Sequence, residues 1–306
     1  MIRHFITIEE LSHDDLTSIL TLATSPFDDT TLSGQGVALV FERPSLRTRA
    51  SSSSAVHELG GYVTFFSDEE IGLDSRESVE DVGRTIAEMY SIAGLRVRRH
   101  EVFARMRAAT DERLSLINLM DDEAHPTQAL ADVLTIADEF SRGDTRELAG
   151  LKVAYVGDAT NVARSLAVAL LRLGVDVTVA APQGYQLVEG GAEDPARILG
   201  PGSLRLVDNV KEAVANADVV YTDTWVSMGL EADGVRRREE LAAFQVNADV
   251  MALAKPSAVV LHCLPAHRGE EVTSDVLDGA QSRVWRQVFH RRSSMIGVLR
   301  WIKGEV

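Results

Sequence analysis

Short apolar runs alternate with stretches of helical periodicity along the whole chain. Runs of about four to eight residues rich in valine, isoleucine and aromatic residues are typical of buried strands, whereas apolar residues repeating every three or four positions indicate helices. The strand-like runs are 36–41, 61–66, 94–98, 114–120, 151–157, 175–182, 204–208, 219–223 and 258–263. Strands that alternate with helices predict parallel sheets covered on both faces. The expected fold class is therefore α/β, with doubly wound parallel sheets.

The length predicts two domains, because 306 residues exceed the usual size of one. We place the first at residues 1–133 and the second at 134–285, with a C-terminal helix, 286–306, completing the first. A helix from His125 to about Phe140 would connect the two sheets. The last amphipathic segment, from about Ser282 to Trp301, has no strand after it and is expected to fold back on the first domain.

Charge and cysteine usage exclude several classes of protein. The formal net charge is -15, which argues against a nucleic-acid partner because phosphate neutralisation needs a basic face. No run approaches the roughly 18 apolar residues of a membrane span, and the first residues lack the apolar core of a signal peptide. Cys263 is the only cysteine, so no intrachain disulfide can form. We expect a cytoplasmic protein without a membrane partner.

Unusual polar clusters follow the predicted strands where those strands end. They are "ERPSLRTR" after 36–41, "DDEAHPTQ" after 114–120, "DATN" after 151–157, "DTWVSMG" around 223–229 and "HCLPAHRG" around 262–269. In open parallel sheets, ligands bind beyond the carboxyl ends of the strands. The pattern therefore predicts one binding cleft between the two domains.

The stretch after the first strand has the features of an anion site. Pro44 ends the strand, Ser45 is a good helix cap, and the residues from Leu46 to Leu59 can form a helix. Free N–H groups at a helix N-terminus favour an anion, and the guanidinium groups of Arg47 and Arg49 favour phosphate. A solvated loop rich in serine and arginine is the alternative for this stretch taken alone.

Taken together, "SLRTR", "HPTQALAD", "DTWVSMG" and "HCLPAHRGEEVT" resemble the aspartate/ornithine carbamoyltransferase family, and the last two resemble its ornithine branch. The resemblance implies an enzyme that transfers the carbamoyl group of carbamoyl phosphate to the δ-amino group of L-ornithine, giving L-citrulline and phosphate in arginine metabolism. It implies a carbamoyl phosphate domain, an ornithine domain and a homotrimer. It also implies that no metal and no cofactor is needed.

The resemblance also assigns roles to individual residues. The residues implied for carbamoyl phosphate are Ser45, Leu46, Arg47, Thr48, Arg96, His125, Gln128, Cys263, Leu264 and Arg291. Those implied for ornithine are Asn161, Asp223, Ser227 and Met228. The implied catalytic residues are Arg96, His125, Asp223, Cys263 and Arg291.

Each candidate residue also has a plainer interpretation. A free cysteine at the end of an apolar strand is more often a small buried hydrophobe than a catalyst. His125 could be a buried histidine at a helix start, Asp223 a turn residue and Met228 core filler. His262, Cys263 and His267 could suggest a zinc site, but no second cysteine cluster supports it.

The sequence departs from the usual family pattern at three places. Leu46 stands where the motif usually has a threonine, Ser53 replaces a glutamate that would pair with Arg49, and "FHRRS" replaces "ENRLH" around Arg291. A buried guanidinium without a counter-charge is costly, so Arg49 must find another acceptor or reach water. We expect weaker or altered carbamoyl phosphate binding. Two alternatives stay open: transfer to a related amine, or a catalytically inactive relative that binds an amino acid or serves in assembly.

Overall fold

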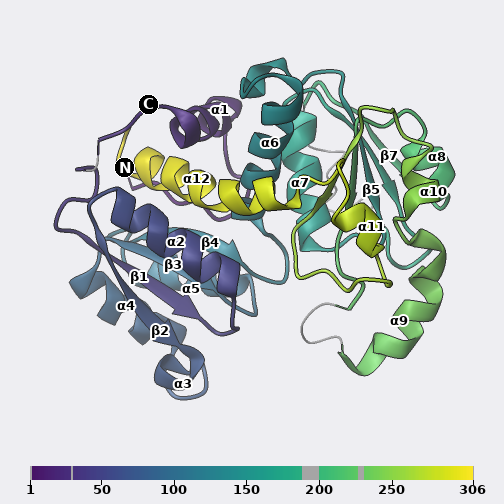
Figure 1. Ribbon diagram of the computed structural model, residues 1–306. Helices are drawn as coiled ribbons and strands as arrows, with labels where there is room; N and C mark the ends of the chain where they lie inside the picture. Colours follow the sequence, from purple (N-terminus) through teal and green to yellow (C-terminus); the bar gives the residue numbers. More distant parts are fainter. Residues whose placement is uncertain (1, 29, 188–199, 227–230, 306) are drawn as a thin grey trace. The chain divides into compact units, whose positions relative to one another are not determined.

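The computed structural model describes residues 2–28, 30–187, 200–226 and 231–305, and it divides into two compact units (Figure 1). Unit 1 consists of Met1–Ala131 and His290–Val306, and unit 2 is Asp132–Phe289. Each unit contains one parallel sheet with helices between its strands, so the predicted α/β class is confirmed. Within the described part of the chain, no helix is long and apolar enough to cross a membrane.

Unit 1 is built on a four-stranded sheet in the order β2-β1-β3-β4. Its strands are β1 (Gly36–Phe41), β2 (Tyr62–Ser67), β3 (Ile92–Arg96) and β4 (Ser115–Met120). Its helices are α1 (His13–Thr24), α2 (Leu46–Glu58), α3 (Asp68–Ile71), α4 (Val79–Met89) and α5 (Glu101–Ala109). Two further helices, α6 (Pro126–Phe140) and α12 (Val284–Ile302), each begin in one unit and end in the other.

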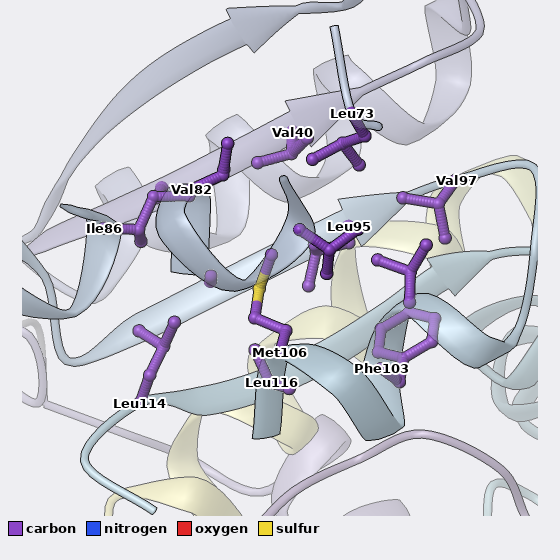
Figure 2. Close-up of a cluster of buried hydrophobic side chains, with 14 of the residues drawn as sticks. Val40, Leu73, Val82, Ile86, Leu95, Val97, Phe103, Met106, Leu114 and Leu116 are labelled. Carbon is purple, nitrogen blue, oxygen red and sulfur yellow. The ribbon is translucent and has the colours of Figure 1, made fainter. Parts of the chain in front are cut away.

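The core of unit 1 forms where α4 and α5 pack on one face of this sheet (Figure 2). Val40 and Leu95 from the strands meet Ile86 of α4 and Phe103 and Met106 of α5. All five side chains are buried, and burial of apolar area is the main force that holds such layers together. The carboxyl ends of these strands lead into polar loops.

Unit 2 is built on a five-stranded parallel sheet in the order β7-β6-β5-β8-β9. Its strands are β5 (Lys152–Val156), β6 (Asp176–Ala180), β7 (Leu204–Val207), β8 (Val219–Thr222) and β9 (Val259–His262). Its helices are α7 (Asn161–Arg172), α8 (Val210–Val214), α9 (Gly234–Leu241), α10 (Ala248–Met251) and α11 (Ser274–Leu277), with short 3-10 helices at Thr145–Glu147, Glu231–Asp233 and Ala242–Phe244.

The two faces of the unit 2 sheet have different contents. Val156, Val220 and Val260 pack on one face with residues of α8, α10 and α11. Because side chains alternate along a strand, Tyr155 and Tyr221 point to the opposite face. Their rings stack at 5.4 Å and 16°, and both are fully buried. This second face thus carries two phenol hydroxyl groups that need hydrogen-bond partners.

All nine predicted strands are present, and the three helices predicted at 46–59, 125–140 and 282–301 correspond to α2, α6 and α12. The largest shift is in β3, which spans Ile92–Arg96 instead of 94–98. Its register against β4 shifts between Leu95 and Arg96, so the regular ladder is interrupted at the last residue of the strand. Such irregularities redirect side chains near functional sites, and sequence periodicity does not reveal them.

The C-terminal half of α12 packs closely on α1 in unit 1. Arg300 is buried and donates hydrogen bonds to the Leu22 carbonyl oxygen at 2.6 Å and to Ser25 Oγ at 3.0 Å, which satisfies groups at the end of α1. Gly297 faces the same helix, and a Cβ there would meet the backbone oxygen of Ile19 and lie 2.9 Å from Ala23 Cβ. The absence of a side chain therefore allows the two backbones to approach.

We expect Gly297→Ala to lower the free energy of unfolding by about 1–3 kcal/mol, because backbone atoms must move to admit the methyl group. Gly83→Ala in α4 is the matched control. Its Cβ would lie 2.8 Å from Met106 Cγ and 3.4 Å from Thr110 Cγ2, both side-chain atoms, with the nearest backbone atom at 3.7 Å, and alanine favours a helix over glycine by about 1 kcal/mol. Urea unfolding of both variants tests this, and equal stability of the two would contradict the expected close packing.

Candidate active site

In unit 1 the predicted anion-binding residues follow neighbouring strands. The loop after β1 leads to Ser45, which caps α2 in an extended conformation and accepts a hydrogen bond from the Thr48 backbone N–H at 3.3 Å. Arg96 ends β3, and His125 lies between β4 and α6. Because β1, β3 and β4 are adjacent in the sheet, their carboxyl ends bring these residues to one edge.

Arg291 of α12 joins this edge from the far end of the sequence. Its Nη1 donates to Gln128 Oε1 at 3.0 Å and its Nη2 donates to Thr48 Oγ1 at 3.2 Å. Arg291 is 4% exposed and both partners are buried as well. Three predicted site residues from α2, α6 and α12 are thus joined by hydrogen bonds, although Thr48 and Arg291 lie 243 residues apart in the sequence.

His125 is buried beside several positive charges. Burial lowers its pKa well below the usual 6.5, and the charges of Arg291, Arg96 and Arg47 lower it further. The imidazole is therefore neutral at physiological pH, and three guanidinium groups lie close enough to act on it. In a chain with a net charge of -15, this local excess of positive charge favours an anionic ligand.

The two departures in α2 have different structural outcomes. Arg49 is exposed, and its guanidinium lies 4.3 Å from the ring centroid of Phe65 and 5.7 Å from that of Phe41. It therefore stacks on aromatic rings and reaches water, so loss of a glutamate at Ser53 leaves no buried charge. Leu46 is 80% exposed at the first position of the helix.

In unit 2 the predicted residues also follow adjacent strands. Asn161 begins α7 after β5, Asp223 follows β8, and Cys263 follows β9. The Cys263 thiol donates to Asp223 Oδ1 at 2.8 Å, and the Thr224 backbone N–H donates to the same oxygen at 2.7 Å. Asp223 is 5% exposed, and burial raises the pKa of its carboxyl group although His262 and Cys263 lower it. Asp223 and Cys263 thus form a pair in which a buried carboxylate accepts from a half-buried thiol.

The backbone next to Cys263 is held by a buried histidine. His262 Nε2 is 3.0 Å from Glu271 Oε1, and His262 Nδ1 accepts from the Leu264 backbone N–H at 2.8 Å. Leu264 has a φ of 60°, which residues other than glycine rarely adopt. The hydrogen bond from its N–H group therefore holds an uncommon backbone conformation.

Two groups among the described residues bring metal-type ligands within 4.8 Å of one another: Asp223, His262 and Cys263, and His267, Glu270 and Glu271. In the first group both nitrogens of His262 already have hydrogen-bond partners, so metal binding would break one of these contacts. In the second group Glu271 accepts from His262 and from the His267 backbone N–H. His267 belongs to a different group from Cys263, so the structure does not favour the three-residue zinc alternative.

An ion pair that the sequence did not predict lies near Asp223. Arg237 of α9 is buried, contacts Asp158 in the loop after β5 and donates to the Trp225 carbonyl oxygen at 2.7 Å. Its guanidinium also lies 4.9 Å from the ring of Tyr185. Arg237 therefore ties together the loops that carry Asn161 and Asp223. Asp158 belongs to the "DATN" cluster, but no spacing in the sequence points to Arg237.

Several predicted residues have less direct support. Asn161 is partly exposed at the first position of α7. Ser227 and Met228 lie outside the described residues. That the two sets of strand-end residues share one cleft stays a prediction.

The architecture and the strand-end residues define a parallel α/β protein with a cluster of arginines around a buried histidine in unit 1 and a buried carboxylate beside a half-buried thiol in unit 2. The profile described as aspartate/ornithine carbamoyltransferase, carbamoyl-P binding domain, matches residues 3–138. The profile of the Asp/Orn binding domain of the same family matches residues 149–302. The chain belongs to the aspartate/ornithine carbamoyltransferase family.

Relatives with names and solved structures resemble the chain over nearly its whole length. It is 38% identical over 302 residues to ornithine carbamoyltransferase of Caldicellulosiruptor saccharolyticus, covering 94% of each chain. It is 41% identical over 279 residues to the anabolic ornithine carbamoyltransferase of Pyrococcus furiosus, covering 90% of this chain and 86% of the relative. The crystal structure of ornithine carbamoyltransferase from Thermus thermophilus superposes with a TM-score of 0.87 at 33% identity, covering 99% of both chains.

The Asp158 carboxyl group gives a test of the buried ion pair. Burial raises its pKa from 3.8 to about 6, against the effect of Arg237 and with that of Asp223. The folded protein then keeps this proton after the unfolded chain has lost it. The stabilising contribution is therefore complete below pH 3.8 and disappears as the pH rises through 6.

We expect the difference in unfolding free energy between wild type and Asp158→Asn to fall by about 2–3 kcal/mol from pH 4 to pH 7. Urea unfolding over this pH range measures it. Asp144→Asn is the control, because Arg146 lowers the pKa of Asp144 to about 2 and its contribution does not change above pH 4. A pH-independent difference for Asp158→Asn would show that its carboxyl group titrates normally.

Proposed function

We propose that this chain transfers the carbamoyl group of carbamoyl phosphate to the δ-amino group of L-ornithine, giving L-citrulline and phosphate. The names of its relatives, which match nearly the whole chain, support this assignment. The observation that carries it is the neutral His125 beside Arg47, Arg96 and Arg291, since this arrangement suits a phosphate dianion joined to a polar carbonyl group. Under this proposal unit 1 binds carbamoyl phosphate and unit 2 binds ornithine.

The phosphate group is assigned to the start of α2. Ser45, Arg47 and Thr48, with the backbone N–H of Leu46, offer hydroxyl, guanidinium and amide donors at a helix N-terminus. Anions are also stabilised there by the helix dipole. The leaving phosphate needs such donors because it departs with its negative charge.

The carbonyl oxygen of the carbamoyl group is assigned to His125, Arg96 and Thr48. Attack on the carbonyl carbon transfers charge to this oxygen, and fixed donors placed there are usually the largest contribution to catalysis. A neutral imidazole can donate through its N–H group to the carbonyl oxygen. Because it carries no positive charge, it does not attract the phosphate away from the guanidinium groups. Gln128, Arg291 and the backbone at Cys263 and Leu264 are assigned to the carbamoyl NH₂ group.

The attacking amine is assigned to Asp223 and Cys263. A free alkyl amine is mostly protonated at pH 7 and must lose a proton before it attacks. Asp223 is an acceptor whose pKa is raised by burial, and it already binds the Cys263 thiol. These groups position the amine and help it to lose its proton, and no covalent bond to Cys263 is required. Asn161, Ser227 and Met228 are assigned to the α-amino and α-carboxylate groups.

A homotrimeric assembly, a cytoplasmic location and a role in arginine biosynthesis remain predictions from the family resemblance. The same holds for the expectation that no metal or cofactor takes part.

A citrulline assay tests the proposed reaction. We expect the purified protein to form citrulline from carbamoyl phosphate and ornithine, and Arg47→Ala or Cys263→Ala to lower kcat/KM by at least about 100-fold, as loss of one fixed donor does in other enzymes. Arg84→Ala, which removes a guanidinium that is 57% exposed elsewhere in unit 1, should have no effect. Absence of citrulline with ornithine, together with phosphate release for another amine, would favour the related-amine alternative.

The exposed Leu46 offers a gain-of-function test. Leu46→Thr adds a hydroxyl group at the start of α2, and a hydrogen bond to a charged phosphate should lower the KM for carbamoyl phosphate by roughly tenfold. Leu46→Val is the control, because valine has the shape of threonine without the hydroxyl group. An equal KM for the two variants would mean that position 46 does not contact the phosphate through its side chain.

A further inference from the structure

A further hydrogen bond joins α6 to α12, in addition to the one between Gln128 and Arg291. Gln287 Nε2 of α12 donates to Asp132 Oδ1 of α6 at 2.8 Å, within unit 2. Asp132 is four residues after Gln128, and Gln287 is four residues before Arg291, so each pair shares one face of its helix. The Asp132–Gln287 contact, which we call the rung, lies within unit 2, and the Gln128–Arg291 contact joins the same two helices within unit 1.

The Asp132–Gln287 rung continues into the sheet. Gln287 Oε1 accepts from the His262 backbone N–H at 2.8 Å, one residue before Cys263. The Tyr221 hydroxyl group of β8 donates to Asp132 Oδ2 at 3.0 Å. Asp132, Tyr221 and Gln287 are at most 1% exposed, so water cannot replace a lost partner without rearrangement.

The chemistry of these groups fixes the direction of every hydrogen bond. A backbone N–H can only donate and a carboxylate can only accept, so the Gln287 amide has one orientation that serves both His262 and Asp132. Rotating the amide would break both contacts. A change in hydrogen-bonding type at residue 132 is therefore transmitted to the backbone beside Cys263.

We propose that Asp132 and Gln287 are positioning residues for the transfer reaction. Gln287 holds the His262 backbone, and thereby the Cys263 thiol at Asp223. Neither residue touches the assigned substrate groups. The effect on turnover rests on the proposed function, whereas the effect on Cys263 does not.

A pair of single variants and their combination tests this inference. Asp132→Asn leaves one acceptor oxygen where the carboxylate has two, so residue 132 can no longer accept from both the Gln287 amide and the Tyr221 hydroxyl group. Gln287→Glu puts a second carboxylate beside Asp132, and the like charges repel. In the double variant, the amide introduced at position 132 donates to one oxygen of the carboxylate introduced at position 287. The other carboxylate oxygen accepts from the His262 N–H, and the oxygen of the new amide accepts from Tyr221.

Two readouts separate positioning from general stability. Cys263 is the only cysteine, so the rate of alkylation by iodoacetamide reports on its surroundings without substrate. We expect each single variant to raise this rate and to lower kcat by roughly tenfold, and the double variant to restore both toward wild type. Ser294→Ala is the control, since it removes a different α12 to α6 hydrogen bond, to the Thr127 carbonyl oxygen at 3.1 Å, and should leave the alkylation rate unchanged.

Wild-type behaviour of both single variants, or a double variant no better than the worse single one, would overturn the proposal. If the double variant recovers thermal stability but neither normal alkylation nor turnover, the rung is only structural and the proposal is also overturned. If a single variant does not fold, the double variant decides alone, because it must fold and react as wild type does. If wild type forms no citrulline, the proposed function fails, and the alkylation rates still decide the role of the rung.

Discussion

The repulsion between positive charges around a buried neutral imidazole is the constraint on which the unit 1 site depends. Arg47, Arg96 and Arg291 all act on His125, which cannot become charged at neutral pH because burial and these groups oppose protonation. Three guanidinium groups repel one another, so they stay together only because the fold holds them there. Under the proposed function, a bound phosphate dianion would relieve this repulsion, and the clustered charges would favour such a ligand over a neutral one.

The fold imposes this arrangement through the ends of its strands. In each unit three adjacent strands present the predicted site residues at their carboxyl ends, while the apolar faces of the sheet hold those ends in place. In unit 2 the strand ends carry an acceptor and a thiol, Asp223 and Cys263, where those of unit 1 carry positively charged donors. The helices α6 and α12 add side chains that the strands cannot supply, namely Gln128 with Arg291 in unit 1 and Asp132 with Gln287 in unit 2.

Sequence reasoning identified what depends on local pattern. Apolar runs predicted all nine strands, and Ser45 followed by a helical pattern predicted the capped start of α2. The place of Arg291 came only from family resemblance, because no local signal links it to Thr48 across 243 residues. Arg237 with Asp158, and Gln287 with Asp132, were missed for the same reason, since each pair meets only after the sheet of unit 2 has formed.

The aromatic contact of Arg49 could not be predicted either, because stacking on Phe65 has no fixed spacing in the sequence. The sequence correctly required another solution for this guanidinium after loss of the glutamate at position 53. Conversely, the register shift at Arg96 depends on pairing between β3 and β4, which the residues of β3 alone do not determine.

The most direct test of this account is the titration of His125 by NMR with ¹⁵N-labelled histidine, assigned by loss of its signals in His125→Gln. We expect the ring to stay neutral well below its ordinary pKa of 6.5 and its signals to change when carbamoyl phosphate is added. An ordinary titration near pH 6.5 that carbamoyl phosphate does not affect would contradict it.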